Sequence, residues 1–222
     1  MIEVFSLRVQ NGAFINYTYV VVNKGAGEAL IVDPGFEYTG IANYIVKTGY
    51  TLKAVLLTHH HTDHVQMAND FAQSFNVPVY MSSAECNYYN FRCLNLQPVP
   101  PDHFFAVGDF DVFMYHTPGH TKGSACFQVE QHLFTGDTLF VEGCGMCAGK
   151  GADPVDMYYS LQKLKQRIEP LVRIYPGHSF GARPGVVFDH VLKENLYLHF
   201  TDVNRFVAFR IRKNQNGIAE FR

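Results

Sequence analysis

The stretch Thr58-His59-His60-His61-Thr62-Asp63-His64 decides the fold expected for this chain of 222 residues. It follows the apolar run 54–57, Ala-Val-Leu-Leu, which is typical of a buried strand. It precedes residues 65–75, whose apolar positions have helical spacing. The stretch therefore lies on a short turn between a strand and a helix. α/β proteins commonly place a functional site on such a turn, because the rigid elements hold it in position.

The residue types in this turn indicate a metal site. His59, His61, Asp63 and His64 form an H-x-H-x-D-H pattern, and neutral imidazole nitrogens and carboxylate oxygens are the usual non-sulfur ligands of zinc and similar divalent metals. The alternative is a solvated polar loop with an accidental cluster of histidines. The interior strand–helix junction is unlike a terminal purification tag and favours the metal site. His60 lies between the ligands, and we expect it to be structural.

A strand followed by a turn with His or Asp recurs three more times, at residues 116–120, 136–137 and 175–178. Strand ends that lie on one edge of a sheet would bring these turns together. Gly119, Gly136 and Gly177 stand beside the polar residues, and glycine permits tight or positive-φ turns. His120, Asp137 and His178 are therefore the further candidate ligands.

The remaining pattern predicts one α/β domain over residues 1–222, with a short C-terminal helical tail and no obvious linker. The expected strands are 2–9, 15–23, 29–32, 54–57, 77–81, 110–114, 127–134 and 172–175, and the expected helices are 38–50, 65–75, 83–93 and 154–169. Three prolines predict an extended loop over 97–103. Residues 188–213 have a mostly helical pattern, although 205–212 also alternate as a strand would.

Composition limits the partners. Hydrophobic residues make up 47% of the chain and charged residues 17%, as in ordinary globular proteins. The net charge of -2 argues against nucleic acid or an anionic membrane as a general partner. We expect no transmembrane helix and no signal peptide. Five cysteines, an odd number, indicate reduced thiols and a cytoplasmic location.

The motifs closely resemble the metallo-β-lactamase superfamily over roughly residues 15–180. Besides the pattern at 59–64, they are Thr-Pro-Gly-His-Thr at 117–121, Phe-Thr-Gly-Asp-Thr-Leu-Phe at 134–140 and Tyr-Pro-Gly-His at 175–178. Residues 136–145 look like the glyoxalase II branch in particular. The compact tail resembles the small zinc-dependent acyl hydrolases of bacterial polyketide biosynthesis clusters.

This resemblance implies a four-layer αββα sandwich with two zinc ions at one edge, iron or manganese being possible instead. It implies that His59, His61 and His120 hold one ion. It further implies that Asp63, His64 and His178 hold the other, with Asp137 as the bridge. Asp33 matches a turn near the site of the family and is expected to orient a ligand.

The resemblance also implies a hydrolase. Two cations about 3.5–4 Å apart can share a hydroxide and lower its pKa towards about 7, and Asp63 is expected to orient that hydroxide while it ligates. A thioester suits this chemistry, because a thiol of pKa about 8.5 leaves as thiolate without a strong general acid.

Departures from the glyoxalase II pattern bear on the substrate. That branch carries a Lys, an aromatic residue and a Tyr where this chain has Met146, Ala148 and Phe180, and its long C-terminal helical domain looks truncated here. An acyl group on the pantetheine arm of an acyl carrier protein or of coenzyme A is therefore preferred over a glutathione thioester. The alternatives are a hydroxyacylglutathione hydrolase, a persulfide dioxygenase with one iron, a nucleic-acid-processing member of the superfamily and a non-catalytic binding protein.

Several residues keep two interpretations. Cys144-x-x-Cys147 is read as plain thiols in preference to a redox pair or a metal site. Arg205, Arg210, Arg212 and Lys213 are read as a solvated basic tail in preference to a docking site for an acidic carrier protein. Tyr88, Tyr89 and Phe91 line a pocket or pack in the core. His116 is expected at a strand end, and the other scattered histidines on the surface are His103, His132, His190 and His199.

Overall fold

The computed structural model describes residues 1–12 and 14–212, which form two six-stranded sheets. The first sheet contains, in spatial order, β1 (Ile2–Asn11), β2 (Phe14–Asn23), β3 (Glu28–Val32), β4 (Thr51–Leu57), β5 (Val79–Ser82) and β6 (Leu96–Val99). The second contains β12 (Val186–Val187), β11 (Arg173–Pro176), β10 (His132–Gly136), β9 (Ala125–Val129), β8 (Phe110–His116) and β7 (His103–Val107).

The strands that carry the polar turns are central and parallel. β3, β4 and β5 pair in parallel in the first sheet, and β10 and β11 do so in the second. Their apolar runs are buried on both faces, as parallel strands covered by helices require. The carboxyl ends of these strands therefore meet at the same edge of the molecule.

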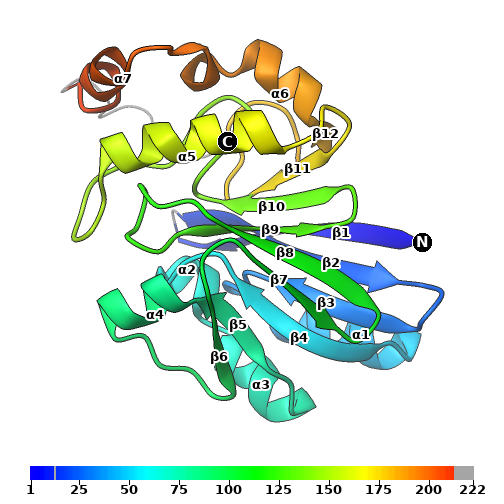
Figure 1. Cartoon of the computed structure of the whole chain (residues 1–222). Helices are drawn as coiled ribbons and strands as arrows, with labels where there is room; N and C mark the ends of the chain where they lie inside the picture. Colours follow the sequence, from blue (N-terminus) through cyan, green and yellow to red (C-terminus); the bar gives the residue numbers. More distant parts are fainter. Residues whose placement is uncertain (13, 213–222) are drawn as a thin grey trace.

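Helices cover both outer faces (Figure 1). α1 (Thr39–Thr48), α3 (Ala68–Phe75) and α4 (Ser83–Tyr89) pack on the first sheet, and α5 (Pro154–Arg167) and α6 (Phe188–Glu194) pack on the second, with α7 (Val203–Arg210) against α5. A third apolar core, which includes Tyr19, Phe110 and Phe127, fills the space between the sheets. The predicted four-layer αββα sandwich is confirmed.

Two expectations about strands were wrong. Residues 97–103 form most of β6 and the start of β7, and Pro98 is tolerated because β6 is an edge strand that need not donate every backbone hydrogen bond. Residues 127–134 span parts of two strands, β9 and β10, which turn at Glu130 with a φ of 48°. That positive φ gave no signal in the sequence, because glutamate rarely adopts it.

Helix limits also differ. The predicted helix at 65–75 is divided into α2 (Thr62–Val65) and α3, and the helix at 83–93 ends at Tyr89. The tail is helical: α6, a 3₁₀ turn at Leu196–His199 and α7 follow one another. The strand alternative for 205–212 is wrong, since α7 extends through Arg210. Lys213 lies outside the described residues.

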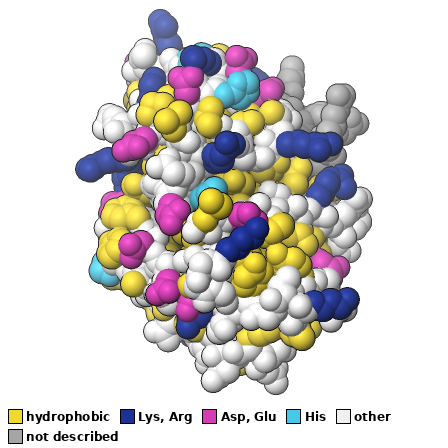
Figure 2. All heavy atoms as spheres, turned by 90° about the vertical axis from the view of Figure 1, so that its right-hand side faces the viewer, with side chains coloured by type: hydrophobic (Ala, Val, Ile, Leu, Met, Phe, Trp, Pro, Cys, Tyr) yellow, Lys and Arg dark blue, Asp and Glu magenta, His cyan; other side chains and the backbone are white. Residues whose placement is uncertain are grey.

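The exterior mixes charges. On the face that looks to the right in Figure 1, acidic and basic side chains are interspersed with apolar ones (Figure 2), which agrees with the small net charge. Among residues 1–12 and 14–212, no helix combines the length and apolar character needed to cross a membrane. The five cysteines, all within the described part of the chain, are unpaired. The cytoplasmic location stays a prediction.

Candidate metal centre

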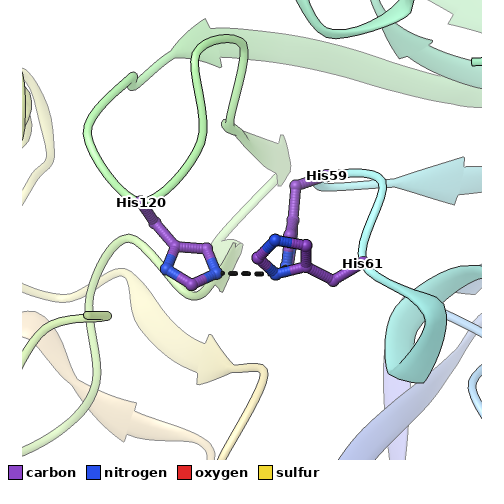
Figure 3. Close-up of side chains that lie close together, drawn as sticks. All are labelled: His59, His61 and His120. Atoms are coloured by element: carbon purple, nitrogen blue, oxygen red, sulfur yellow. Dashed lines mark hydrogen bonds between the residues drawn. The ribbon is translucent and has the colours of Figure 1, made fainter. Parts of the chain in front are cut away.

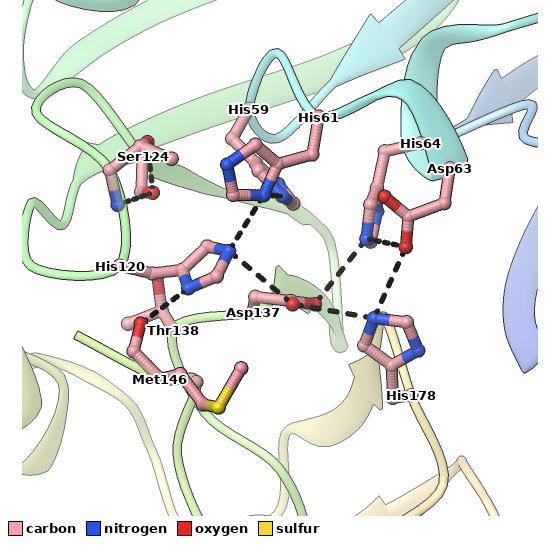
Figure 4. Close-up of polar contacts among 12 residues, drawn as sticks. His59, His61, Asp63, His64, His120, Ser124, Asp137, Thr138, Met146 and His178 are labelled. Atoms are coloured by element: carbon pink, nitrogen blue, oxygen red, sulfur yellow. Dashed lines mark hydrogen bonds and ion pairs between the residues drawn. The ribbon is translucent and has the colours of Figure 1, made fainter. Parts of the chain in front are cut away.

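All seven predicted ligands converge at the edge where the parallel strands end (Figure 4). They come from the turn after β4 and the loops after β8, β10 and β11. Their ligand atoms form three overlapping groups, and within each group the atoms lie within 4.8 Å of one another: His59 with His61 and His120, His59 with His64 and Asp137, and Asp63 with His64 and His178.

The first group consists of His59, His61 and His120 (Figure 3). His61 Nδ1 lies 3.1 Å from His59 Nε2 and 3.0 Å from His120 Nε2. His120 Nδ1 donates its proton outward to the carbonyl oxygen of Met146 at 2.7 Å, so its Nε2 presents a lone pair to the group.

His59 is oriented in the same sense through a hydroxyl relay. The Thr58 hydroxyl donates to Asp33 Oδ2 at 2.7 Å, so it accepts from His59 Nδ1 at 3.1 Å. His59 Nε2 therefore also carries a lone pair that faces the group. Both lone pairs face His61 Nδ1, which can donate a proton to only one of them, whereas a cation would satisfy both.

The second group consists of Asp63, His64 and His178, with Asp137 beside it. Asp63 Oδ2 lies 3.6 Å from His64 Nε2 and 3.5 Å from His178 Nε2. Asp137 lies between the groups: its Oδ1 is 3.5 Å from His64 Nε2, and its Oδ2 is 3.5 Å from His120 Nε2 and 3.3 Å from His178 Nε2. This is the placement that a bridging carboxylate needs.

Both histidines of the second group also donate outward. His64 Nδ1 donates to Asp33 Oδ2 at 2.9 Å, and His178 Nδ1 donates to the carbonyl oxygen of Ile15 at 2.7 Å. Asp33 thus orients His64 directly and His59 through Thr58, as the family resemblance implied. Asn16, at the same edge on β2, donates to Asp63 Oδ2 at 2.9 Å and was not foreseen.

The donor set fits metal ions. Asp137 Oδ1 is buried and accepts no hydrogen bond from the described residues, although such an oxygen costs free energy unless a donor or a cation satisfies it. Imidazole nitrogens and carboxylate oxygens suit zinc, which binds them at about 2.0–2.2 Å. The separations of about 3 Å between ligand atoms allow this. The assignment of the seven residues as ligands stays a prediction.

Comparison with known proteins decides the family. A sequence model described as "Metallo-beta-lactamase superfamily" matches residues 11–178. The chain belongs to the metallo-beta-lactamase superfamily. It is 42% identical to a "Probable polyketide biosynthesis zinc-dependent hydrolase BaeB" of Bacillus velezensis over 99% of this chain and 98% of that protein. It is a hydrolase of this superfamily.

Two further proteins are similar to this chain. A hydroxyacylglutathione hydrolase of Shewanella loihica is 31% identical over 74% of this chain and 62% of that protein. A crystal structure of a metallo-beta-lactamase from Staphylococcus aureus superposes with a TM-score of 0.85 at 22% identity, covering 99% of this chain and 72% of that one. The latter shows the shared fold.

In the first ligand group, burial keeps the three imidazoles neutral. Burial, together with repulsion from His64 and His120, lowers the pKa of His59 well below its ordinary value. Burial and repulsion from His120 lower the pKa of His61 to about 4. Burial also lowers the pKa of His120, although Asp137 attracts its charged form. These nitrogens therefore need not lose a proton before they bind a cation at pH 7.

The second group behaves in the opposite way. Burial acts to lower the pKa of His64, but attraction by Asp137 and the hydrogen bond to Asp33 outweigh it and raise the pKa to about 9. The pKa of His178 is raised, because Asp137 overcomes the effect of burial. Burial acts to raise the pKa of Asp137, but His178 and His64 together hold it well below its ordinary value.

This contrast predicts that zinc binding to the second group is the more pH-dependent. His64 is protonated in the metal-free protein up to about pH 9, against 6.5 for an ordinary imidazole. Its proton stabilises the metal-free fold fully below pH 6.5, and this contribution is lost as the pH rises through 9. If the second group binds zinc, the ion must displace that proton, so the affinity for a second equivalent should rise by about tenfold per pH unit between pH 6 and 8.

Calorimetric titration of chelator-stripped protein with zinc at pH 6, 7 and 8 measures this dependence. Two buffers of different ionisation enthalpy report the protons released with each equivalent. The first equivalent should release few protons and the second about one or more. Equal proton release by the two equivalents would contradict the assignment of His64 to a distinct, proton-linked position.

Glu85 has a role that was not predicted; it lies in the first turn of α4 and is fully buried. Its Oε1 accepts from the backbone N–H of His60 at 3.0 Å and from His60 Nδ1 at 2.6 Å. Its Oε2 accepts from Thr121 Oγ1 at 2.9 Å and from the Gly123 N–H at 2.8 Å. Glu85 therefore ties the turn with His59 and His61 to the loop with His120.

Other predicted residues are placed as follows. His60 is structural: its ring stacks on Tyr89 with centroids 3.8 Å apart. Phe91 packs with the core under the first sheet, whereas Tyr88 is partly exposed. His116 ends β8, and His103, His190 and His199 are exposed, but His132 is half-buried and contacts Tyr175.

Arg210 and the cysteine pair Cys144 and Cys147 are not simple surface residues. Arg210 is buried and its Nε donates to the carbonyl oxygen of Gly145 at 3.0 Å, so the expectation of a solvated Arg210 is wrong, whereas Arg205 and Arg212 are exposed. Burial raises the pKa of the Cys147 thiol to about 11 and that of Cys144 still further. Both cysteines are therefore thiols of low reactivity.

Glycine is required at position 177 for a different reason from the one expected. Gly119 and Gly136 have a positive φ, but Gly177 does not. A Cβ at this position would lie 2.5 Å from Asp137 Oδ1 and 2.6 Å from His64 Cε1. Glycine is needed here because the backbone before His178 passes directly behind two ligands of the other loops.

Proposed function

We propose that this chain is a zinc-dependent thioesterase that uses two zinc ions to hydrolyse acyl thioesters of a pantetheine carrier, either an acyl carrier protein or coenzyme A. The observation that carries the proposal is the two-part ligand set. Imidazole nitrogens and carboxylate oxygens converge in two adjacent groups, and between them lies Asp137, whose Oδ1 accepts no hydrogen bond from the described residues.

Bound zinc ions would lower the pKa of a shared water and polarise the substrate carbonyl. The residues of the chain hold the ligand side chains and orient them. Asp33 and the carbonyl oxygens of Ile15 and Met146 accept the outward Nδ1 protons of the ligand histidines, which holds the rings in one tautomer. Asp63 Oδ2 faces the second group and is positioned to accept a proton from an attacking water.

The leaving group supports a thioester. A thiol of pKa about 8.5 departs as thiolate near neutral pH, so no protonated group has to stand beside it. Within the first group, burial lowers the pKa of the three imidazoles, which makes them unsuited to donate a proton. An amide, whose nitrogen needs a proton to leave, is a poorer match to these side chains.

The choice of carrier is supported by the pocket beside the ligands and by the relatives. Met146 and Phe180 line this pocket, where the glyoxalase II pattern has polar residues. The Bacillus velezensis relative, which is named as a polyketide biosynthesis hydrolase, matches over 99% of this chain, whereas the hydroxyacylglutathione hydrolase matches over 74%. Glutathione thioester hydrolysis is the second candidate, since relatives with that name share the ligand-bearing region.

The test is a hydrolysis panel with zinc-loaded protein. Acyl carrier protein thioesters, coenzyme A thioesters and lactoylglutathione are compared by the release of free thiol, with metal content measured on the same samples. We expect the two pantetheine carriers to exceed lactoylglutathione by at least about tenfold in kcat/KM, or about 1.4 kcal/mol. Chelation should abolish the activity and zinc should restore it. Activity confined to lactoylglutathione would refute the carrier, and one iron per chain without thioester hydrolysis would favour a dioxygenase.

A further inference from the structure

The cavity beside the metal ligands has a volume of about 330 Å³ and extends to the end of α7. This volume lies at the lower end of the range for small-molecule sites, about 300–1,000 Å³. The pantetheine arm proposed above would bind along this cavity, with its sulfur near the ligands. The wall includes three candidate ligands and the residues at the end of α7: His120, Asp137, His178, Phe209, Arg210 and Arg212.

The apolar part of the wall begins at the ligands. The Phe140 ring lies 6.0 Å from the ring of His178 and stacks on Phe180 with centroids 4.7 Å apart. Leu196 and Tyr197 continue this surface. A pantetheine arm carries two amides and two methyl groups but no charge, so it can lie against these rings without the desolvation of an ion. Its phosphate, at the end away from the sulfur, is the only group of the phosphopantetheine arm that needs a cation.

Arg212, two residues after the end of α7, supplies an exposed cation in the lining of the cavity. Its guanidinium lies over the Phe209 ring at 3.6 Å from the centroid, and its Nη1 donates to the Phe209 carbonyl oxygen at 3.3 Å. No carboxylate among residues 1–12 and 14–212 forms an ion pair with it. A guanidinium has five N–H donors in a planar fork that matches the oxygens of a phosphate. Arg212 is therefore both held against the wall and able to donate to a ligand.

Arg210 lines the same cavity but is engaged within the protein. It is buried, and its Nε donates to the carbonyl oxygen of Gly145 at 3.0 Å. The next residue of that loop, Met146, accepts from His120 Nδ1. Arg210 thus fixes the end of α7 relative to the ligands, and through it the position of Arg212.

One acidic residue, Glu142, also lines the cavity. Its backbone N–H donates to the carbonyl oxygen of Phe180 at 3.0 Å, and its side chain lies against Gly181. Glu142 therefore belongs to the wall formed with the loop after β11, whereas Arg212 belongs to the wall formed by the helical tail. A phosphate in the cavity is favoured on the side of Arg212.

We infer that Arg212 binds the phosphate of a phosphopantetheine arm that occupies this cavity. Acyl carrier protein and coenzyme A both have this phosphate next to pantetheine. The inference rests on the proposed thioesterase activity and names the residue that recognises the carrier. It follows that a thioester of pantetheine without the phosphate is a poorer substrate.

The experiment compares the butanoyl thioesters of pantetheine and of 4′-phosphopantetheine with zinc-loaded protein at low ionic strength. The two compounds differ only in the phosphate, so the ratio of their kcat/KM values measures its contribution. The phosphate should raise kcat/KM by at least about fivefold, as a favourable exposed ion pair does. This ratio should decrease at about 0.5 M salt, because screening weakens the pair. Equal values for the two thioesters at low salt would overturn the inference.

A matched pair of variants assigns the effect to one residue. Arg212→Gln removes the charge in the cavity and should reduce the ratio to about one. Arg205→Gln removes the same charge at an exposed position of α7 outside the cavity and should leave the ratio as it is. An unchanged ratio in Arg212→Gln would show that this side chain does not contact the phosphate. An equal loss of kcat/KM for both thioesters would show a structural role, and either result overturns the inference.

Thioesters of the two natural carriers distinguish the sources of the phosphate. Because butanoyl-acyl carrier protein and butanoyl-coenzyme A share the phosphate next to pantetheine, Arg212→Gln should lower kcat/KM for both by a similar factor relative to Arg205→Gln. A loss confined to one carrier would assign Arg212 to the nucleotide or to the surface of the carrier protein, and would overturn the inference.

A binding measurement separates this inference from the proposed function. If no thioester is hydrolysed, the thioesterase proposal fails, but Arg212 can still be tested with non-hydrolysable thioethers. Calorimetry then compares S-butyl-pantetheine with S-butyl-4′-phosphopantetheine. Tighter binding of the phosphorylated compound, lost in Arg212→Gln and kept in Arg205→Gln, supports the phosphate site. Equal binding of the two compounds refutes it.

Discussion

If Asp137 bridges the two zinc ions proposed above, replacing it by asparagine should lower kcat/KM of the zinc-loaded protein by about 10²- to 10⁴-fold, because a charge worth several kcal/mol is lost. The carboxylate lies between the two histidine groups, with His64, His120 and His178 each within 3.5 Å of one of its oxygens. Asparagine preserves the shape but carries no charge, and its NH₂ group has no lone pair with which to bind a cation. We expect zinc content to fall from two ions per chain toward one.

Elemental analysis and thiol-release kinetics on the same samples measure both effects. Asp111→Asn is the matched control. Asp111 is exposed on β8, and its substitution removes the same charge at a position away from the ligands. It should retain metal content and activity. A variant of Asp137 that keeps two zinc ions and near-normal kcat/KM would show that this carboxylate does not bridge.

Replacing Glu85 by alanine should lower the free energy of unfolding by about 3–5 kcal/mol, because two buried and two partly buried donors lose their acceptor. Glu85→Gln should cost about 1–3 kcal/mol, since each carboxylate oxygen accepts from an N–H and the amide NH₂ must face one of them. Each kcal/mol corresponds to about 2–4 °C in melting temperature for a chain of this size.

Metal binding distinguishes a purely structural role of Glu85 from a role in positioning the ligands. Glu85 connects His60, between two ligands, to Thr121, beside a third. Under native conditions the variants should therefore bind the first zinc about 10- to 100-fold more weakly. Glu169→Gln, at an exposed residue, is the control for both measurements. Unchanged zinc affinity in a destabilised Glu85→Gln would limit Glu85 to a role in folding.

The sequence was most informative where chemistry and local order coincide. The H-x-H-x-D-H pattern between a buried strand and a helix indicates candidate metal ligands by residue type and spacing alone. The later strand–turn units with His120, Asp137 and His178 add to it, because parallel strands end at one edge of a sheet. For the same reason the layered fold followed from the apolar runs.

Contacts between residues far apart in the sequence could not be predicted in this way. Glu85 looks like an ordinary acidic residue in a helix's first turn, and Arg210 looks like part of a basic tail. Glu85 is buried because α4 packs against the loops with His60 and Thr121, and Arg210 because α7 packs over the loop with Gly145. Their partners lie 25–65 residues away in sequence.

Thus the sequence by itself predicted the types of the candidate ligands, their order along the chain and the sheet edge on which they lie, because strand periodicity and donor chemistry are local properties. Only the tertiary structure decided which nitrogen of each histidine faces inward, that Asp137 lies between two groups, and that an apolar cavity begins at Phe140 and ends at α7. These features depend on hydrogen bonds and packing between elements distant in the chain, which residue order does not encode locally.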